Sequence, residues 1–341
     1  MLRPVSNPPN PWSSTHVEWI GEPPAAALEV FEEKARAILA QNESPDLPFR
    51  WSLNPYRGCT HACAYCYARP SHQYLGLGAG TDFDRKIVVK VNAPERLRAT
   101  LQRRSWKREL IMFSGNTDAY QPLEAAYRLT RGCLEVCHVF RTPVAVITKS
   151  ALVRRDIDVL AAMARDGLAS VFISIPILDD ALSRKIEPNA SLPSKRFETL
   201  ALLAGSGIPT GVSVSPVIPG LSESDIPTIL ERAYAAGARR AFSIPLRLAP
   251  EVEVVFGERL RSALDPARVR HVESALRDVR GGKMNETAFG KRMRGVGARW
   301  EIIAQLFHST CRRLGFNAEP ADAIPEASQP APRIGRQLKL L

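Results

Sequence analysis

Three of the six cysteines in this chain, Cys59, Cys63 and Cys66, fall within eight residues at the spacing C-x3-C-x2-C. Thiolate sulfurs this close in sequence can bind one soft metal centre if the backbone curls around it. Gly58 and the small residues between the cysteines permit that curl. Three ligands are one fewer than an electron-transfer iron–sulfur cluster normally takes. A centre short of one protein ligand keeps a position for a substrate or cofactor. We call residues 59–66 the cysteine loop.

Two other uses of these cysteines stay open at this point. One is a zinc site with His61 or His72 as the fourth ligand, although structural zinc sites usually draw ligands from two separated pairs. The other is disulfide bonding, which is unusual for three such close cysteines in a large chain. Cys133 and Cys137 share one face of a predicted helix, and we expect these two and Cys311 to be small, buried core residues.

The residues around the cysteines resemble those of the radical SAM enzymes. In that family a three-cysteine loop holds a 4Fe–4S cluster, and S-adenosylmethionine (SAM) chelates the fourth iron through its amino and carboxylate groups. The residue before the third cysteine is characteristically aromatic and lies near the adenine; here it is Tyr65. The resemblance implies reductive cleavage of SAM to a 5′-deoxyadenosyl radical, hydrogen abstraction from a substrate, and an external electron donor such as flavodoxin or ferredoxin.

Longer strings narrow the resemblance to the branch that includes spore photoproduct lyase-like proteins. The likeness runs from about Arg50 to Phe316 and indicates the radical chemistry without indicating the substrate. The strings that carry it are Asn54-Pro55-Tyr56-Arg57-Gly58-Cys59, Tyr65-Cys66-Tyr67-Ala68-Arg69, Thr117-Asp118-Ala119-Tyr120-Gln121-Pro122, Ile147-Thr148-Lys149-Ser150 and Pro219-Gly220-Leu221.

Short apolar runs alternate with amphipathic helical patterns, which predicts parallel β/α units with right-handed crossovers. The expected strands are Arg50–Asn54, Leu110–Ser114, Val144–Thr148, Ser170–Ile175, Gly211–Ser215 and Ala241–Leu246. The expected helices between them are Leu123–Cys137, Leu152–Arg165, Lys195–Ser206 and Asp225–Ala236. Six strands agree with the partial (β/α)6 TIM-like barrel that the family resemblance implies.

The rest of the chain divides by composition and periodicity. We expect a flexible lead at 1–25, a radical SAM core at 26–250, a helical C-terminal extension at 251–316 and a disordered basic tail at 317–341. Within the core we further expect a helix over Ala25–Leu39, a rim strand over Asp82–Val91 and a helix over Pro94–Arg104. The helices expected in the extension are Glu251–Leu264, Pro266–Arg280 and Gly297–Leu314.

Chemistry in such barrels gathers at the carboxyl ends of the strands, where we expect the SAM contacts. Family members place a glycine-rich stretch after the second strand to bind the amino group of SAM. Here that stretch is Gly115, Asn116, Thr117 and Asp118, which a helix cap would also explain. The remaining predicted contacts are Lys149 for a carboxylate or a substrate anion, Ser174 for ribose hydroxyls, and Val214 and Ile218 for the adenine face.

The net charge of +11 and the pI near 9.6 indicate either a basic, solvated surface or a polyanionic partner such as nucleic acid. Residues 280–299, which we call the basic loop, hold six basic residues, one acidic residue (Glu286) and five glycines. Backbone N–H groups of glycines can approach phosphate closely. The loop therefore predicts a nucleic-acid contact, with a charged flexible loop as the alternative.

No apolar run approaches the length of a membrane span, and the segment Met1–Pro11 lacks the apolar core of a signal peptide. We therefore predict a cytoplasmic protein that does not contact membranes. The leading hypothesis is a radical SAM enzyme that acts on nucleic acid or another anionic substrate. The alternatives are the same chemistry on a protein or small molecule, and a metal- or cluster-binding nucleic-acid adaptor without catalysis.

Overall fold

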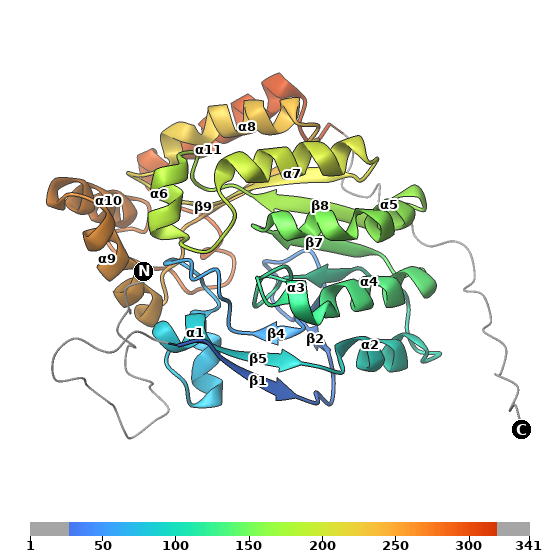
Figure 1. The fold of residues 1–341 in the computed structure, drawn as a ribbon. Helices are drawn as coiled ribbons and strands as arrows, with labels where there is room; N and C mark the ends of the chain where they lie inside the picture. Colours follow the sequence, from blue (N-terminus) through green and yellow to red (C-terminus); the bar gives the residue numbers. More distant parts are fainter. Residues whose placement is uncertain (1–26, 319–341) are drawn as a thin grey trace, which may run out of the picture.

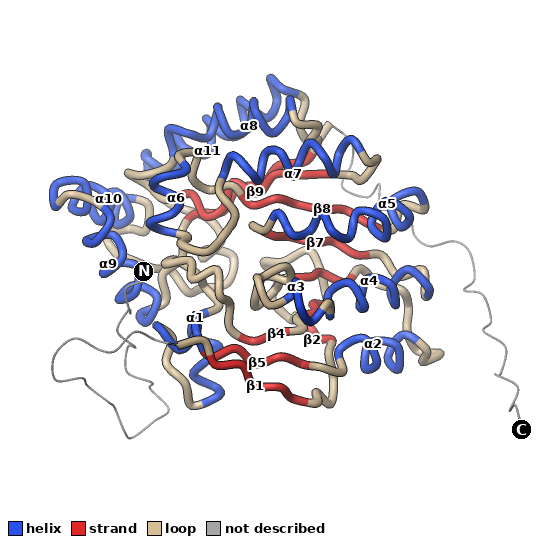
Figure 2. Tube along the Cα trace, in the orientation of Figure 1, coloured by secondary structure: helices blue, strands red, loops and turns tan. Residues whose placement is uncertain are grey.

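The largest sheet of the protein contains seven strands (Figures 1 and 2). The computed structural model describes residues 27–318, so the predicted lead and residues 319–341 of the predicted tail lie outside the described residues. The strand order is β10-β9-β8-β7-β6-β3-β2, parallel throughout except that β2 runs antiparallel to β3. The strands are β2 Leu39–Gln41, β3 Trp51–Leu53, β6 Ile111–Phe113, β7 Val144–Thr148, β8 Ala169–Ser174, β9 Thr210–Val217 and β10 Arg240–Pro245.

The parallel strands are apolar runs because both faces of the sheet are covered. Val146 on β7 pairs in register with Val171 on β8, and both side chains are fully buried. Helices contributed by the crossovers lie alongside the sheet (Figure 1), with α5 and α7 against β8 and α8 against β9. They are α2 Ala93–Leu101, α4 Leu129–Val139, α5 Ile157–Arg165, α7 Pro193–Gly205 and α8 Ile226–Ala235. The predicted partial (β/α)6 TIM-like barrel is confirmed.

The predicted helix over Ala25–Leu39 is wrong. Residues Glu29–Glu33 form strand β1, which pairs in parallel with β5 (Lys86–Lys90) in a second sheet of order β1-β5-β4, where β4 is Tyr56–Arg57. Four of the five β1 residues are exposed, so the apolar spacing there does not mark a buried helix face. Pairing with a strand more than fifty residues away satisfies the β1 backbone, and this tertiary contact overrides the local pattern.

Three other predicted elements are divided in the structure. Arg128 adopts a left-handed conformation with φ of 52°, which separates α3 (Glu124–Tyr127) from α4 within the predicted helix Leu123–Cys137. The predicted rim strand over Asp82–Val91 begins with a helical turn, α1 (Thr81–Arg85), before β5. The predicted helix Leu152–Arg165 begins as a 3-10 helix, η2 (Ala151–Asp156), before α5. Short elements that the sequence did not predict are β2, β4, α6 Asp180–Ile186, η1 Arg69–Leu75 and η3 Glu223–Asp225.

The predicted C-terminal helices are present as α9 Pro250–Ala263, α10 Pro266–Asp278 and α11 Gly297–Leu314. Apolar side chains of α9 and α10 share one buried core with Cys63 and Tyr65 of the cysteine loop. Helix α11 instead packs against α8 on the barrel. The division of the chain into domains stays a prediction. Within residues 27–318, no helix is long and apolar enough to cross a membrane.

Candidate active site

The cysteine loop follows β3 and β4 and is folded back on itself by main-chain hydrogen bonds. The N–H groups of Ala62 and Cys66 donate to the carbonyls of Cys59 and Cys63, at 3.2 and 3.3 Å. Gly58, just before the loop, has φ of +78°, and a Cβ there would lie only 2.9 Å from the carbonyl oxygen of Phe83. The tight entry to the loop therefore requires glycine.

All three loop cysteines are free thiols; Cys59 and Cys63 are buried, and Cys66 is partly buried. Burial, followed by the charges of Glu187 and the other two cysteines, raises the pKa of Cys63 well above its usual value. Burial and the nearby Cys59 sulfur raise the pKa of Cys66 to about 11. Coordination to a metal deprotonates a thiol outright. A cluster bound by these cysteines would therefore stabilise thiolates that the loop does not stabilise by itself.

Arg69 fixes the cysteine loop from behind. Its guanidinium is fully buried, and its Nε and Nη2 donate to the carbonyl oxygen of Cys63 at 3.1 and 2.8 Å. Nη1 donates to the carbonyls of Ala79 and Gly80, and Nη2 also bonds Asp84 at 2.9 Å. These acceptors engage the donors of the planar fork. Arg69 belongs to one of the sequence motifs, but the motif does not indicate this role.

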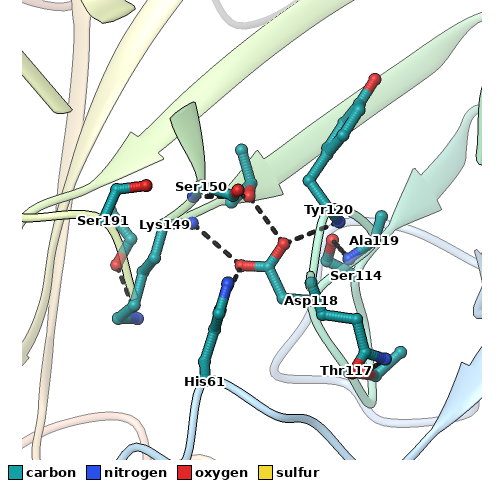
Figure 3. Close-up of polar contacts among 12 residues, drawn as sticks. His61, Ser114, Thr117, Asp118, Ala119, Tyr120, Lys149, Ser150 and Ser191 are labelled. Atoms are coloured by element: carbon teal, nitrogen blue, oxygen red, sulfur yellow. Dashed lines mark hydrogen bonds and ion pairs between the residues drawn. The ribbon is translucent and has the colours of Figure 1, made fainter. Parts of the chain in front are cut away.

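Asp118 connects the cysteine loop to the end of β7 (Figure 3). Its Oδ2 lies 3.4 Å from Nδ1 of His61 and accepts the N–H of Lys149 at 2.9 Å. Its Oδ1 accepts the Thr148 hydroxyl at 2.6 Å and the N–H of Tyr120 at 2.9 Å. Burial opposes both charges, yet the pair raises the pKa of His61 to about 10 and holds that of Asp118 well below its usual range. Protein donors thus occupy both oxygens that we predicted for the SAM ammonium.

The segment after β6 also contacts the cysteine loop through the other predicted residues Gly115, Asn116 and Thr117. The Thr117 hydroxyl donates to the carbonyl of Gly58 at 2.7 Å. The carbonyl of Gly115 accepts the hydroxyl of Tyr67 at 2.7 Å. The N–H of Asn116 donates to the side chain of Asn54 at 2.7 Å. The structure therefore brings this predicted segment and the cysteines together.

Lys149, Ser174 and Tyr65 converge beside the loop from three different segments. Nζ of Lys149, after β7, donates to the hydroxyl of Ser174 at the end of β8 at 3.1 Å and lies 5.6 Å from the ring centroid of Tyr65. The Tyr65 hydroxyl bonds the buried carboxylate of Glu187, which pairs with Arg196 at 2.5 Å. Burial raises the pKa of Glu187 despite the opposing charge of Arg196. The sequence pattern does not indicate a role for Glu187 or Arg196.

The two predicted adenine contacts are both buried but belong to different apolar cores. Ile218 follows β9 and lies in the core that contains Tyr65 and Cys63. Val214 lies within β9 in the main barrel core. The structure therefore groups Ile218 with the cysteine loop, whereas it places Val214 among the barrel side chains.

Comparison with protein families adds to this geometry. Residues 53–233, more than half of the chain, match the model of the radical SAM superfamily. The chain belongs to the radical SAM superfamily. It is therefore an enzyme whose cofactors are a 4Fe–4S cluster and S-adenosylmethionine, and the alternative of an adaptor without catalysis is set aside.

Two curated relatives of this radical SAM enzyme are uncharacterized proteins. One, from Mycobacterium tuberculosis, is 40% identical over 204 residues, which are 58% of this chain and 60% of that protein. The other, from Methanocaldococcus jannaschii, is 30% identical over 194 residues, which are 57% of this chain and 70% of that protein. The matched region thus spans about 60% of the length of the mycobacterial relative.

Among solved structures, the radical SAM enzyme is similar to a mutant of spore photoproduct lyase with bound AdoMet and dinucleoside spore photoproduct. The TM-score is 0.55 at 17% identity, and the alignment covers 84% of this chain and 78% of that one. This likeness shows a shared fold.

The alternatives for the cysteines of this radical SAM enzyme can now be compared with its structure. Nδ1 of His61 pairs with Asp118, and Nε2 of His72 lies 2.8 Å from the carbonyl of Lys86. Within residues 27–318, no three His, Cys, Asp or Glu side chains are grouped to hold a single metal ion. All six cysteines are free thiols, so the disulfide alternative is wrong. Buried positions for Cys133, Cys137 and Cys311 are confirmed.

The basic loop divides into anchored and exposed charges. Arg280 is 5% exposed and donates to the carbonyls of Leu246 and Arg294, and burial lowers its pKa to about 10. Arg292 pairs with Asp46 at 2.6 Å. Arg299, the third anchored residue, pairs with two carboxylates on other elements. The exposed basic side chains of the basic loop are Lys283, Lys291 and Arg294.

Proposed function

We propose that Cys59, Cys63 and Cys66 hold the 4Fe–4S cluster of this enzyme and that nucleic acid is its substrate. When bound, the cluster and SAM supply a 5′-deoxyadenosyl radical that abstracts hydrogen from the substrate. The observation that carries the proposal is the convergence of Lys149 and Tyr65 beside three free cysteines, of which Cys59 and Cys63 are buried. The reducing electron comes from an external donor of the flavodoxin or ferredoxin type.

The polar groups around the cysteines suit the charged ends of SAM. We assign the carboxylate of SAM to the ammonium of Lys149 and its ribose hydroxyls to Ser174, because these two groups already lie within hydrogen-bond distance of each other. Tyr65 and Ile218 share one apolar core and suit the adenine. The side-chain amide of Asn116 bonds to no group within residues 27–318, so its oxygen is an acceptor for the SAM ammonium.

Asp118 has a different role in this proposal from the one that its position in the sequence suggested. Its carboxylate accepts from Thr148 and from the backbone of Lys149 while it pairs with His61 on the cysteine loop. We infer that Asp118 positions the loop relative to Lys149 rather than binding SAM directly. The predicted contact of Val214 with adenine stays a prediction.

Nucleic acid is the substrate class that the charges favour. The chain carries a net charge of +11, and three basic residues of the basic loop are exposed and form no ion pair with a carboxylate of residues 27–318. Backbone phosphates neutralise such side chains with a large gain in affinity at low salt. The fold relative, spore photoproduct lyase, binds a dinucleoside in its solved complex, which is consistent with this substrate class.

A deuterium-transfer experiment tests the proposed function. The reconstituted full chain is incubated without oxygen with SAM, dithionite and single- or double-stranded DNA or RNA made from perdeuterated nucleotides. We expect deuterium in the 5′-deoxyadenosine that is released, because the abstracted atom comes from the nucleic acid. If 5′-deoxyadenosine forms with all four polymers but contains no deuterium in any of them, nucleic acid is excluded as the substrate. That result would favour a protein or small-molecule substrate.

A further inference from the structure

Arg247 follows β10 by two residues and thus lies at the carboxyl end of the last parallel strand. Its guanidinium is partly buried, and its one hydrogen bond within residues 27–318 joins Nη1 to the thioether sulfur of Met293 at 3.5 Å. Its Nε is shielded from solvent and has no hydrogen-bond partner in the described part of the chain. A thioether is a weak acceptor, so the positive charge lacks the oxygen ligands that partial burial normally requires.

Other buried arginines of the protein show what such ligands look like. Arg69 and Arg196 each bond a buried carboxylate as well as main-chain carbonyls. Arg280 bonds carbonyl oxygens at the end of β10 and in the basic loop. These three guanidinium groups are structural because the fold itself supplies their acceptors. Arg247 differs from them in lacking an oxygen acceptor from residues 27–318.

The surroundings of Arg247 connect it to the cysteine loop. Leu246 and Leu248, on either side of Arg247, are buried in the apolar core that also contains Cys63 and Tyr65. The Tyr67 ring is 58% exposed, and its hydroxyl bonds the carbonyl of Gly115. An anion bound by Arg247 would therefore lie near the cysteine loop, where Tyr67 is exposed to solvent.

The acidic group near Arg247 does not neutralise it. Asp46 accepts from Nε of Arg292 at 2.6 Å and from the N–H of Gly290 at 2.7 Å, so its charge is already matched. Arg292 also stacks on the exposed ring of Phe289, 4.3 Å from its centroid. Arg247 and Arg292 together carry two positive charges, and Asp46 neutralises one of them. The exposed rings of Tyr67 and Phe289 suit stacking against the bases of a single strand.

We propose that Arg247 binds one backbone phosphate of the nucleic-acid substrate and so sets the nucleotide that lies beside the cysteine loop. This inference rests on the proposed function and adds to it one contact that determines which nucleotide lies beside the cysteine loop. Arg247 would be a specificity-determining residue, whereas the exposed lysines and arginine of the basic loop would bind phosphates without selecting a position.

The test uses the reconstituted full chain with SAM and fluorescein-labelled oligothymidylates, each with one neutral methylphosphonate linkage at a successive position. Affinity is read by fluorescence anisotropy for the wild type, Arg247→Gln and the matched control Arg294→Gln, which removes an exposed charge from the basic loop. We expect Arg247→Gln to lower affinity about tenfold or more, because a charge-assisted hydrogen bond is lost. A neutral linkage at one position should lower wild-type affinity by a similar factor. At that position it should not lower the affinity of Arg247→Gln any further.

The control separates a single contact from general charge. Arg294→Gln should weaken binding less and by the same factor for every oligonucleotide. Iron content and SAM affinity report on folding, and Arg247→Lys, which keeps the charge, should recover part of the lost affinity. If Arg247→Gln does not take up iron, the wild type and Arg247→Lys are compared instead. One linkage position that lowers wild-type affinity most, with a smaller effect in Arg247→Lys, would support the proposal. Equal wild-type affinity for every linkage position would overturn it.

Different failures have different meanings. Wild-type binding to the oligonucleotides with an unchanged affinity in Arg247→Gln would overturn this inference alone. Loss of SAM affinity in Arg247→Gln with oligonucleotide binding intact would also overturn it, because the anion would then be the SAM carboxylate. Absence of oligonucleotide binding by the wild type at low salt would overturn the proposed substrate class and this inference together.

Discussion

The cysteine loop and the basic loop both depend on buried arginines, but they differ in how completely the fold holds them. Arg69 bonds the cysteine loop and its surroundings from one fully buried position, and Gly58 and Asp118 fix its entry and its far side. The basic loop is held at Arg280, Arg292 and its final residue, with exposed lysines and glycines between these anchors. The cysteine loop is thus fixed along its length, whereas the basic loop is fixed only at three arginines.

The largest effect should come from the ligands themselves. Changing any one of Cys59, Cys63 or Cys66 to Ala should abolish the brown chromophore and SAM cleavage, because two thiolates cannot replace three. Cys133→Ala is the matched control, since this buried thiol lies in the barrel core. Iron content and 5′-deoxyadenosine are measured. A single loop variant with a full iron load and SAM cleavage would show that the ligand assignment is wrong.

Removing the clamp behind the loop should have the next largest effect. Arg69→Met leaves the Asp84 carboxylate buried without its partner and frees the Cys63 carbonyl, so the free energy of unfolding should fall by about 3–5 kcal/mol. Arg313→Met removes an exposed pair with Glu231 and should cost at most about 1 kcal/mol. Urea unfolding measures the free energy of unfolding of both variants. An equal fall in the two variants would show that the buried arginine is no more important for stability than the exposed one.

Changes in the SAM pocket should weaken binding without loss of iron. Lys149→Met removes a charged donor and should reduce SAM affinity by about 1.5–3 kcal/mol, whereas Ser174→Ala removes a neutral one and should cost about 1 kcal/mol. Lys195→Met, on the exposed side of α7, is the control and should leave affinity unchanged. Isothermal titration measures all three. Unchanged SAM affinity in both pocket variants would place the pocket elsewhere.

The smallest effect per residue should come from the basic loop. Replacing Lys283, Lys291 and Arg294 together with Ala should flatten the log–log dependence of nucleic-acid affinity on salt by about 2–3 units, because each phosphate contact contributes roughly 0.7–0.9. Iron content should stay the same, since these side chains are exposed and lie outside the cysteine loop. An unchanged slope would mean that the exposed charges only solvate the surface.

Much of the barrel could be predicted from the sequence because its strands are buried apolar runs, as Val144–Thr148 and Ala169–Ser174 show. The cysteine ligands could be proposed because they lie close together in sequence. Strand β1 could not be predicted, since it is exposed and depends on a distant pairing partner. The bond from Tyr65 to Glu187 spans 122 residues, so no local pattern indicates it.

Asp118 shows a second limit of prediction from sequence. Its type and place after a strand suggested a free acceptor for an ammonium group, but four protein donors surround its two oxygens in the structure. Two of these donors belong to the end of β7 and one to the cysteine loop, and only the folded chain brings them together. Whether a carboxylate oxygen is free to accept a hydrogen bond from a ligand thus depends on its neighbours in the folded chain, which spacing in the sequence does not reveal.

Electron–nuclear double resonance of the reduced, reconstituted wild type would detect SAM bound to the cluster directly, with SAM labelled by ¹⁵N at the amino group and ¹⁷O at the carboxylate. We expect hyperfine coupling from both labels to the cluster, because three cysteines leave one iron for SAM. Absence of both couplings at saturating SAM, in protein with a full iron load, would contradict a three-cysteine cluster at Cys59, Cys63 and Cys66.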